Sequence, residues 1–381
     1  MLAGKNIFYY IITSLLFLGS CREAYISPVN PESQNLLVVE GFLNTGFEPT
    51  VINLSRTLRL VDSIPYKPEV GANVTVESEN GSTWNLSATS PGRYEIFHLP
   101  LSPDQKYRLV IRTMGGEVYE SDFIPVIITP PIDSISWVQN SEKDVEINIS
   151  THDPSNNTRY YRWDYEETWE IHSAWTSEYY FDNMTERMYE RDNPQILYFC
   201  WKTLPSTEIL MGSTAKQAED IVRNLKLKTI KYGEQRLAVR YSIMLKQYGL
   251  TKDAFDYWQT MKKNTEGMGS IFDPQPSVNF SNIRNVNNPE KPVIGFLSAG
   301  SYTSKRIFIR RNEIDWLYRR FCEDIVVPNI KDSLVLFFGT GSLIPTYGHF
   351  NEFGAIVGYS GSTAPCVDCR LTGSPFRPPF W

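Results

Sequence analysis

Histidine is scarce in this sequence, and the motifs that carry common enzyme chemistry are missing from it. The chain has 381 residues and only 4 histidines, and no two of them are spaced as a pair of zinc ligands. It contains no His-Glu-x-x-His helix, no Gly-x-Ser-x-Gly elbow and no glycine loop that would hold a phosphate. We therefore expect no catalytic residues, no metal site and no cofactor.

Positive charge is also in short supply. Lys and Arg total 37 against 43 Asp and Glu, which gives a net charge of -6, and the basic residues form no cluster. Nucleic-acid-binding proteins present a basic patch, so we expect no nucleic-acid partner. After Cys21 the sequence has no apolar run of roughly 20 residues, the length that a membrane-spanning helix needs. The 41% of hydrophobic residues instead predicts packed globular cores, and the length favours two domains.

The N-terminus has the pattern of a secretory signal. Lys5 precedes an apolar stretch from Ile7 to Leu18, and Gly19 and Ser20 follow it. A charged start, an apolar core of about a dozen residues and small residues before the cleavage site are typical of such signals.

Cys21, directly after these small residues, indicates the signal of a lipoprotein. The run Leu18-Gly19-Ser20-Cys21 resembles the lipobox of bacterial lipoproteins, in which the cysteine is acylated and becomes the first residue of the mature protein. We predict a signal peptide over residues 1–20, lipidation at Cys21 and a polar tether over residues 21–34. Three acyl chains, as such lipoproteins carry, give a stable membrane anchor. The alternative is an ordinary signal with a chance cysteine.

Four cysteines remain beyond Cys21. An even number of cysteines in an exported chain predicts disulfides, and four cysteines allow three pairings, all of which stay open. Two of them have C-x-x-C spacing, but glycine, serine and three prolines follow them, which disfavours a redox helix. We predict structural disulfides among Cys200, Cys322, Cys366 and Cys369.

The first part of the mature chain has the alternation of half-buried strands. Val74 and Val76 alternate with polar residues, and the stretch from Tyr107 to Ile111 does the same between glycine-rich turns. We predict an N-terminal β-sandwich domain of about seven strands over residues 35–131. The segment from Gly71 to Arg112 resembles a transthyretin-like or carboxypeptidase-regulatory-like module.

A second β-domain is predicted over residues 132–381. Tyr161, Trp163 and Tyr165 alternate with charged residues, which is typical of an Ig-like sheet with one polar face. Thr251 is placed to cap a helix with apolar positions at helical spacing, and residues 214–225 are predicted as a shorter helix. The fold class is therefore mainly β, with two Ig-like or transthyretin-like β-sandwiches, an α-helical insertion in the second and a disulfide-held C-terminal tail.

Two groups of side chains are candidates for function. Asp164 and Glu166 lie two residues apart on a strand, about 6.6–7 Å along it, within the spacing of an inverting glycosidase pair. A solvated strand face is the competing interpretation, and the one we favour. The better candidates are aromatic residues in a less periodic segment, which we predict as an interaction surface: Trp175, Tyr179, Tyr180 and Phe181.

Several segments resemble one family of Bacteroidota outer-membrane lipoproteins, known as domain of unknown function 4249. They span nearly the whole mature chain and include 38–41, 161–170, 199–201, 206–210, 241–248, 263–266, 270–276, 288–296 and 366–381. The resemblance implies an accessory lipoprotein that accompanies a TonB-dependent outer-membrane transporter. Three Asp-Ser-Ile/Leu sites also resemble the O-glycosylation motif of that phylum, with Ser63, Ser134 and Ser333 as the candidates.

The sequence therefore predicts a non-enzymatic lipoprotein of the outer membrane, which serves a TonB-dependent transporter as an accessory or ligand-capturing subunit. Whether it faces the surface or the periplasm is open, because Glu23 is the one acidic residue just after Cys21. One alternative is a surface glycan-binding or adhesin-type module that acts alone. Another is a glycoside hydrolase-like enzyme that uses Asp164 and Glu166.

Overall fold

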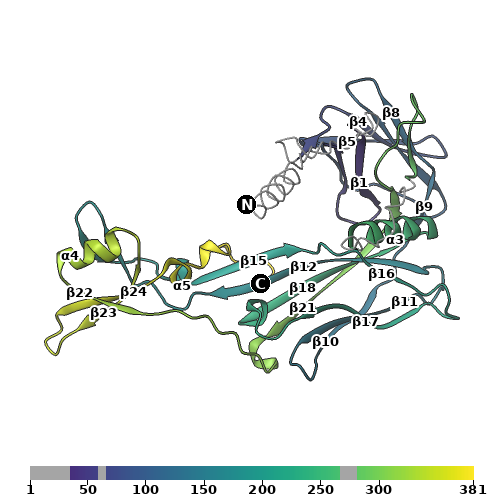
Figure 1. Ribbon diagram of the computed structural model, residues 1–381. Coiled ribbons are helices and arrows are strands. Elements are labelled where there is room, and N and C mark those ends of the chain that lie inside the picture. Colours follow the sequence, from purple (N-terminus) through teal and green to yellow (C-terminus); the bar gives the residue numbers. More distant parts are fainter. Residues whose placement is uncertain (1–34, 59–65, 267–280) are drawn as a thin grey trace, which may run out of the picture.

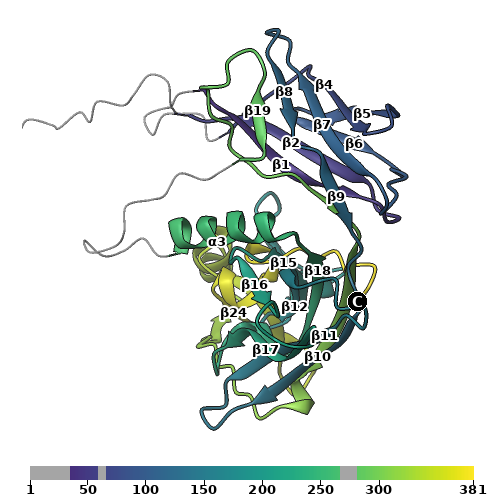
Figure 2. The same ribbon diagram turned by 90° about the vertical axis from the view of Figure 1, so that its right-hand side faces the viewer.

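The computed structural model describes residues 35–58, 66–266 and 281–381. The chain is mainly β, and its strands gather in three units (Figure 1). Cys21 and Ser63 lie outside the described residues. In Figure 2 the helix α3 (Lys252–Glu266) lies between the upper unit, a barrel, and the central unit, a sandwich, both described below.

The upper unit is a closed barrel. Its eight strands form a closed sheet, because the last strand of the order, β9 (Ile124–Ile127), pairs with the first, β7 (Lys106–Arg112). In ring order they are β7, β4 (Asn73–Ser78), β5 (Thr83–Ser90), β6 (Arg93–Ile96), β2 (Thr50–Arg56), β1 (Leu37–Asn44), β20 (Ser298–Gly300) and β9. The barrel is extended by β8 (Val118–Ser121), β19 (Ile283–Asn285) and the short β3 (Lys67–Pro68).

This closure corrects the predicted sandwich over residues 35–131. Strand β20 comes from the chain after α3 and inserts in parallel between β1 and β9, so its pairing removes the two edges that a sandwich would leave open. The backbones approach closely there. A Cβ on Gly300 would meet the carbonyl oxygen of Ile127 at 2.0 Å, and one on Gly295, where φ is +134°, would meet that of Val39 at 2.1 Å. Glycine is required at both positions.

The central unit is a sandwich of two sheets. One sheet contains β10 (Ile132–Gln139), β11 (Val145–His152) and β17 (Ile221–Ile230). The other contains β15 (Phe199–Pro205), β12 (Tyr160–His172), β18 (Arg240–Gly249) and β21 (Tyr302–Arg310), with β16 (Leu210–Ser213) beside β12. One hydrophobic core fills the space between them, and it includes Tyr161, Trp163 and Tyr165, which confirms the alternation.

The two helix predictions had opposite outcomes. Helix α3 begins where expected, with the backbone N–H of Ala254 bonded to Thr251 Oγ1 at 3.2 Å. The predicted helix over 214–225 is wrong. Thr214 begins a turn in which its hydroxyl bonds Asp220 Oδ1, and Ile221 then starts β17, whose apolar residues pair against β11. In this segment the pairing of β17 with β11 determines the structure, although the apolar residues are also spaced as in a helix.

The third unit, which we call the distal unit, was not predicted as a separate body. It consists of residues 178–190 and 323–362 and lies at the left of Figure 1. Its elements are β13 (Tyr179–Asp182), β14 (Arg187–Glu190), β22 (Ile325–Pro328), α4 (Lys331–Leu334), the π-helical turn 335–339, β23 (Ile344–Phe350) and β24 (Ile356–Ser362). The predicted disulfide-held C-terminal tail therefore has two parts: residues up to 362 contribute to a unit with a core of its own, and the residues that follow are bonded to the sandwich through Cys200–Cys369.

Candidate interaction surface

The distal unit is assembled from two segments that are far apart in the sequence. The hairpin β13–β14 leaves the sandwich after β12, and its Tyr179 ring packs edge-on against Tyr359 of β24 at 5.1 Å between centroids. The backbone N–H of Glu178 bonds the carbonyl of Thr346 at 2.7 Å, and Glu186 forms an ion pair with Lys331. These contacts hold the hairpin to the sheet of β22, β24 and β23.

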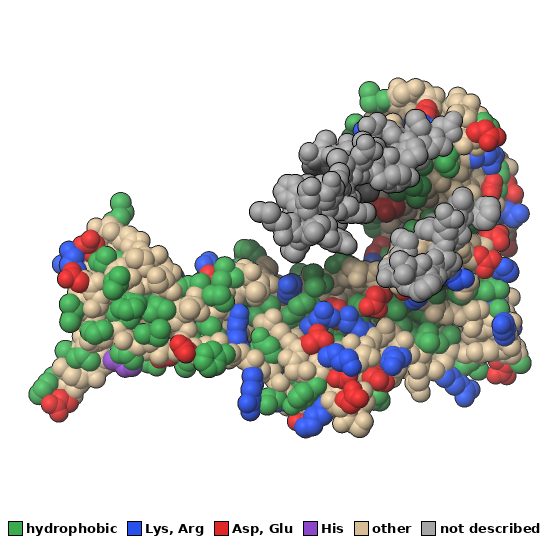
Figure 3. All heavy atoms as spheres, in the orientation of Figure 1, with side chains coloured by type: hydrophobic (Ala, Val, Ile, Leu, Met, Phe, Trp, Pro, Cys, Tyr) green, Lys and Arg blue, Asp and Glu red, His purple; other side chains and the backbone are tan. Residues whose placement is uncertain are grey.

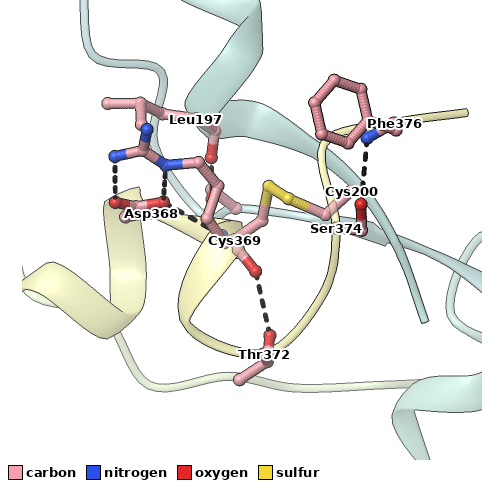
Figure 4. Close-up of a disulfide and its surroundings, with 9 residues drawn as sticks. Leu197, Cys200, Asp368, Cys369, Thr372, Ser374 and Phe376 are labelled. Atoms are coloured by element: carbon pink, nitrogen blue, oxygen red, sulfur yellow. Dashed lines mark hydrogen bonds and ion pairs between the residues drawn. A yellow bond between two sulfur atoms is a disulfide. The ribbon is translucent and has the colours of Figure 1, made fainter.

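Two disulfides hold the C-terminal segment in place. Cys200 at the start of β15 is bonded to Cys369, and Cys322 is bonded to Cys366, each pair with its Cα atoms 5.7 Å apart. Figure 4 shows the first of them beside Leu197, Ser374 and Phe376. The prediction of two disulfides is confirmed, and of the three open pairings the structure selects one.

The predicted aromatic candidates divide between core and surface. Tyr179 is buried in the distal core, and Phe181 packs against the same core from a half-buried position. Trp175 is half-buried outside the unit, and its Nε1 atom has no hydrogen-bond partner among the described residues. Tyr180 is 40% exposed and stacks on Tyr189 at 5.7 Å. Of the four residues, Tyr180 alone presents an exposed ring.

The distal unit carries much apolar surface that sequence reasoning missed. Figure 3 shows hydrophobic side chains gathered over this end of the molecule. Ten large hydrophobic side chains of the unit are exposed, and we call them the exposed apolar set: Tyr180, Met184, Tyr189, Ile325, Val326, Ile330, Leu336, Phe350, Phe353 and Val357. Single exposed hydrophobics are normal, whereas contiguous apolar patches are typical of contact sites. The runs Ile325-Val326 and Phe350 to Phe353 are the signal that was available in the sequence.

One edge of the distal sheet is apolar as well. The strand order is β22, β24, β23, so β22 lies at an edge, and no described strand pairs with its outer side. Ile325 and Val326 on this strand are exposed, and so is Ile330 just after it. An exposed hydrophobic edge strand offers unpaired N–H and C=O groups to a second chain.

The interior of the distal unit contains a polar network that resembles hydrolase chemistry in composition but not in geometry. Ser360 Oγ donates to Asp324 Oδ2 at 2.8 Å and lies 2.8 Å from Nε2 of His349, and Tyr347 also donates to Asp324. In a catalytic triad the histidine lies between the serine and the acid. Here the serine lies between them and is fully buried, so the network ties β23 and β24 to the segment before β22.

The predicted carboxylate pair lies on the outer face of the sandwich. Asp164 forms an ion pair with Arg162 at 2.9 Å, and Glu166 faces Arg306 at 3.6 Å. Both carboxylates therefore have arginine partners, which fits the interpretation of a solvated strand face. Among residues 35–58, 66–266 and 281–381 no group of three His, Cys, Asp or Glu side chains is placed to hold a metal ion. Of the glycosylation candidates, Ser134 is exposed on β10 and Ser333 is half-buried in α4.

Comparison with known proteins identifies the family. The family described as "Domain of unknown function (DUF4249)" matches residues 23–306. The chain belongs to this family. The description assigns no activity to DUF4249. The matched residues include the barrel and most of the sandwich, whereas the second segment of the distal unit, 323–362, lies beyond them.

Structural and curated neighbours add little to the DUF4249 assignment. The FN1–FN3 domains of chicken CNTN1 are 13% identical over 57% of this chain, with a TM-score of 0.19, and the match spans 63% of that protein. A two-domain fibronectin type-III segment of chicken tenascin is 13% identical over 57% of this chain and 91% of its own length, with a TM-score of 0.17. No curated protein matches. Within the described residues, no helix has the length and apolar character to cross a bilayer.

Proposed function

We propose that this protein is a non-enzymatic outer-membrane lipoprotein that docks onto a TonB-dependent transporter through its distal unit. It serves that transporter as an accessory or ligand-capturing subunit. The observation that carries the proposal is the exposed apolar set, which a small unit presents away from the barrel (Figure 3). The partner class comes from the resemblance to Bacteroidota lipoproteins that accompany such transporters.

The distal unit has the properties of a docking element. Tyr179, Val327 and Phe338 give it a core of its own, so its surface is held by a folded body and little ordering is needed on binding. The apolar edge strand β22 also lets a partner add a strand, in which main-chain hydrogen bonds supply affinity. A stable interface buries about 1,200–2,000 Å² in total, and exposed aromatic rings such as Tyr180, Phe350 and Phe353 are the side chains that concentrate its energy.

In this proposal the lipid anchor holds the protein at the outer membrane. Acylated Cys21 would fix the chain to the outer membrane, and the tether over residues 21–34 would separate the barrel from the lipid surface. Fourteen extended residues span at most about 50 Å. The tether therefore keeps the folded part close enough to the membrane to meet a transporter embedded in it.

Co-purification from detergent-solubilised membranes tests the proposal. The triple variant Val326→Asp, Phe350→Asp, Phe353→Asp places charge at exposed positions, so the fold should be retained while the partner is lost. The matched control is Phe47→Asp with Met114→Asp, at barrel positions that are 93% and 77% exposed. A transporter recovered with the wild type and the control, but not with the triple variant, supports the proposal. Equal recovery with all three proteins contradicts docking through the distal unit.

A further inference from the structure

A groove of about 540 Å³ lies where the C-terminal segment crosses the outer face of the sandwich. Phe199 and Trp201 of β15 line one side, and Phe376 and Trp381 of the C-terminal segment line the other. Arg240 of β18 also lines it. This site is distinct from the distal unit, because none of the exposed apolar set contributes to it.

The C-terminal wall of the groove is firmly held. Trp201 and Ser374 exchange two backbone hydrogen bonds of 2.8 Å, and the adjacent Cys200 is bonded to Cys369 (Figure 4). Trp381 packs edge-on against Phe308 of β21 at 5.6 Å. The aromatic walls are therefore in position before any ligand arrives, which lowers the entropic cost of binding.

Arg240 is the unusual residue of this groove. Its guanidinium lies 4.3 Å from the ring centroid of Phe308 and 5.0 Å from that of Trp381. In the described part of the chain, its buried Nε atom has no hydrogen-bond partner, and the nearby charge is that of Glu170, which also lines the groove. Arginine carries five N–H donors and stays protonated, so a guanidinium beside aromatic rings, with its Nε atom unpaired, has donors to offer an anionic ligand.

The nearby carboxylate does not fill this role. Glu170 lines the groove, but His172 Nε2 lies 2.7 Å from one of its oxygens and Trp381 Nε1 donates to the other at 3.2 Å. The hydrogen bond from His172 is the main cause that keeps the pKa of Glu170 below its ordinary value, with Trp381 and the charge of Arg240 assisting against burial. Glu170 is thus ionised and already occupied, and the donors of Arg240 remain for a ligand.

We propose that this groove binds an acidic saccharide, with the carboxylate of a uronic acid on Arg240. Aromatic rings present flat apolar faces on which the CH faces of pyranose rings stack. The side-chain amides of Asn193 and Gln195, which also line the groove, each carry donors and acceptors that match sugar hydroxyls. A guanidinium pairs with a carboxylate through two parallel hydrogen bonds.

A free phosphate or a lipid headgroup fits this lining less well. Phosphate sites gather several cations or backbone N–H groups. The cations lining this groove are Arg240 and Arg377, and Arg377 already donates to the carbonyl oxygen of Trp381 at 2.6 Å, while Glu170 adds a negative charge. The inference rests on the ligand-capturing part of the proposed function, but it needs no partner protein and is measured on purified protein. Its failure would leave the co-purification result unchanged, so the two can be told apart.

Calorimetric titration with oligogalacturonate and oligomannuronate tests the site. We expect wild-type protein to bind at least one of them, and its methyl ester at least tenfold more weakly. Arg240→Gln should weaken binding at least tenfold, and Phe376→Ala, at a position that is 81% exposed, several-fold without altering the fold. The control Arg112→Gln, an exposed arginine of the barrel, should bind as wild type does.

Three results would overturn the inference. One is the absence of wild-type binding to both oligosaccharides. Another is unchanged affinity in both Arg240→Gln and Phe376→Ala. The last is equal binding of inorganic phosphate or of phosphatidylglycerol vesicles, which would show a general anion or headgroup site instead.

Discussion

Cys200 and Cys369 are joined by a disulfide that closes 169 residues of chain and links the sandwich to the C-terminal segment. The partner of Cys200 is not the nearest cysteine in the sequence, and the bond joins the two segments whose residues line the aromatic groove. The second bond, between Cys322 and Cys366, closes the shorter stretch of 44 residues that contains most of that unit.

Both bonds should contribute to stability. Removing a native disulfide typically costs about 2–5 kcal/mol, and the chain-entropy model gives the longer loop the larger effect. We expect the double variant Cys200→Ser, Cys369→Ser to lose more unfolding free energy than Cys322→Ser, Cys366→Ser in guanidinium titrations. A thiol assay on denatured, unreduced protein should detect no thiol from these four residues. Four free thiols would contradict the pairing.

Cys21 should carry the membrane anchor. In the variant Cys21→Ala no thiol is present for acylation, so the signal should stay uncut or the protein should be released in soluble form. Fractionation of cells with detection of the protein in each fraction measures this. Cleaved Cys21→Ala protein that still fractionates with the outer membrane would show that no lipid is needed.

Neighbouring tyrosines of β13 should behave differently. Tyr179 is buried against Tyr359, so Tyr179→Ala leaves a cavity in the distal core and should destabilise that unit by about 3 kcal/mol. Tyr180 points to solvent, so Tyr180→Ala should change stability by no more than about 0.5 kcal/mol. Chemical denaturation compares the two. Equal losses would show that the hairpin is not seated as described.

Glu117 should make the barrel sensitive to acid. Burial raises the pKa of its carboxyl, but hydrogen bonds from Lys291, Tyr119 and Arg56 outweigh burial and lower it to about 2. An unfolded glutamate titrates near about 4.3. A group with a lowered pKa in the folded state contributes stability that is fully present above about pH 4.3 and is lost as the pH falls toward 2.

The variant Glu117→Gln isolates this contribution. Its melting temperature should be lower than that of the wild type at pH 6, and the difference should shrink as the pH falls to about 2.5. Glu79→Gln, at an exposed position of the same barrel, is the control and should follow the wild type. A difference that stays constant with pH would assign the loss to packing instead of charge.

Sequence patterns predicted those elements of the fold that depend on residues close together in the chain. The alternation at Tyr161, Trp163 and Tyr165 marked a core strand, and Thr251 marked the start of α3. Barrel closure could not be predicted in this way, because β20 has three residues and its parallel pairing depends on contacts more than a hundred positions away.

The placement of the aromatic candidates could not be predicted for the same reason. Tyr179 and Tyr180 were both predicted as interaction residues, but Tyr179 is buried, and which of the two rings is buried depends on Tyr359, far along the chain. The groove beside Arg240 was missed entirely, because its walls come from residues near 200 and near 376. A disulfide with three open pairings gave no means of bringing those segments together.

Site-specific photo-crosslinking in intact cells tests the central claim most directly. A photoreactive phenylalanine analogue at Phe353 places the probe in the exposed apolar set, and the same analogue at Phe47 places it on the barrel at a similar exposure, 93% against 85%. The proposal predicts a covalent adduct with a TonB-dependent transporter from position 353 and none from position 47. An adduct from position 47 with none from 353 would contradict docking through the distal unit.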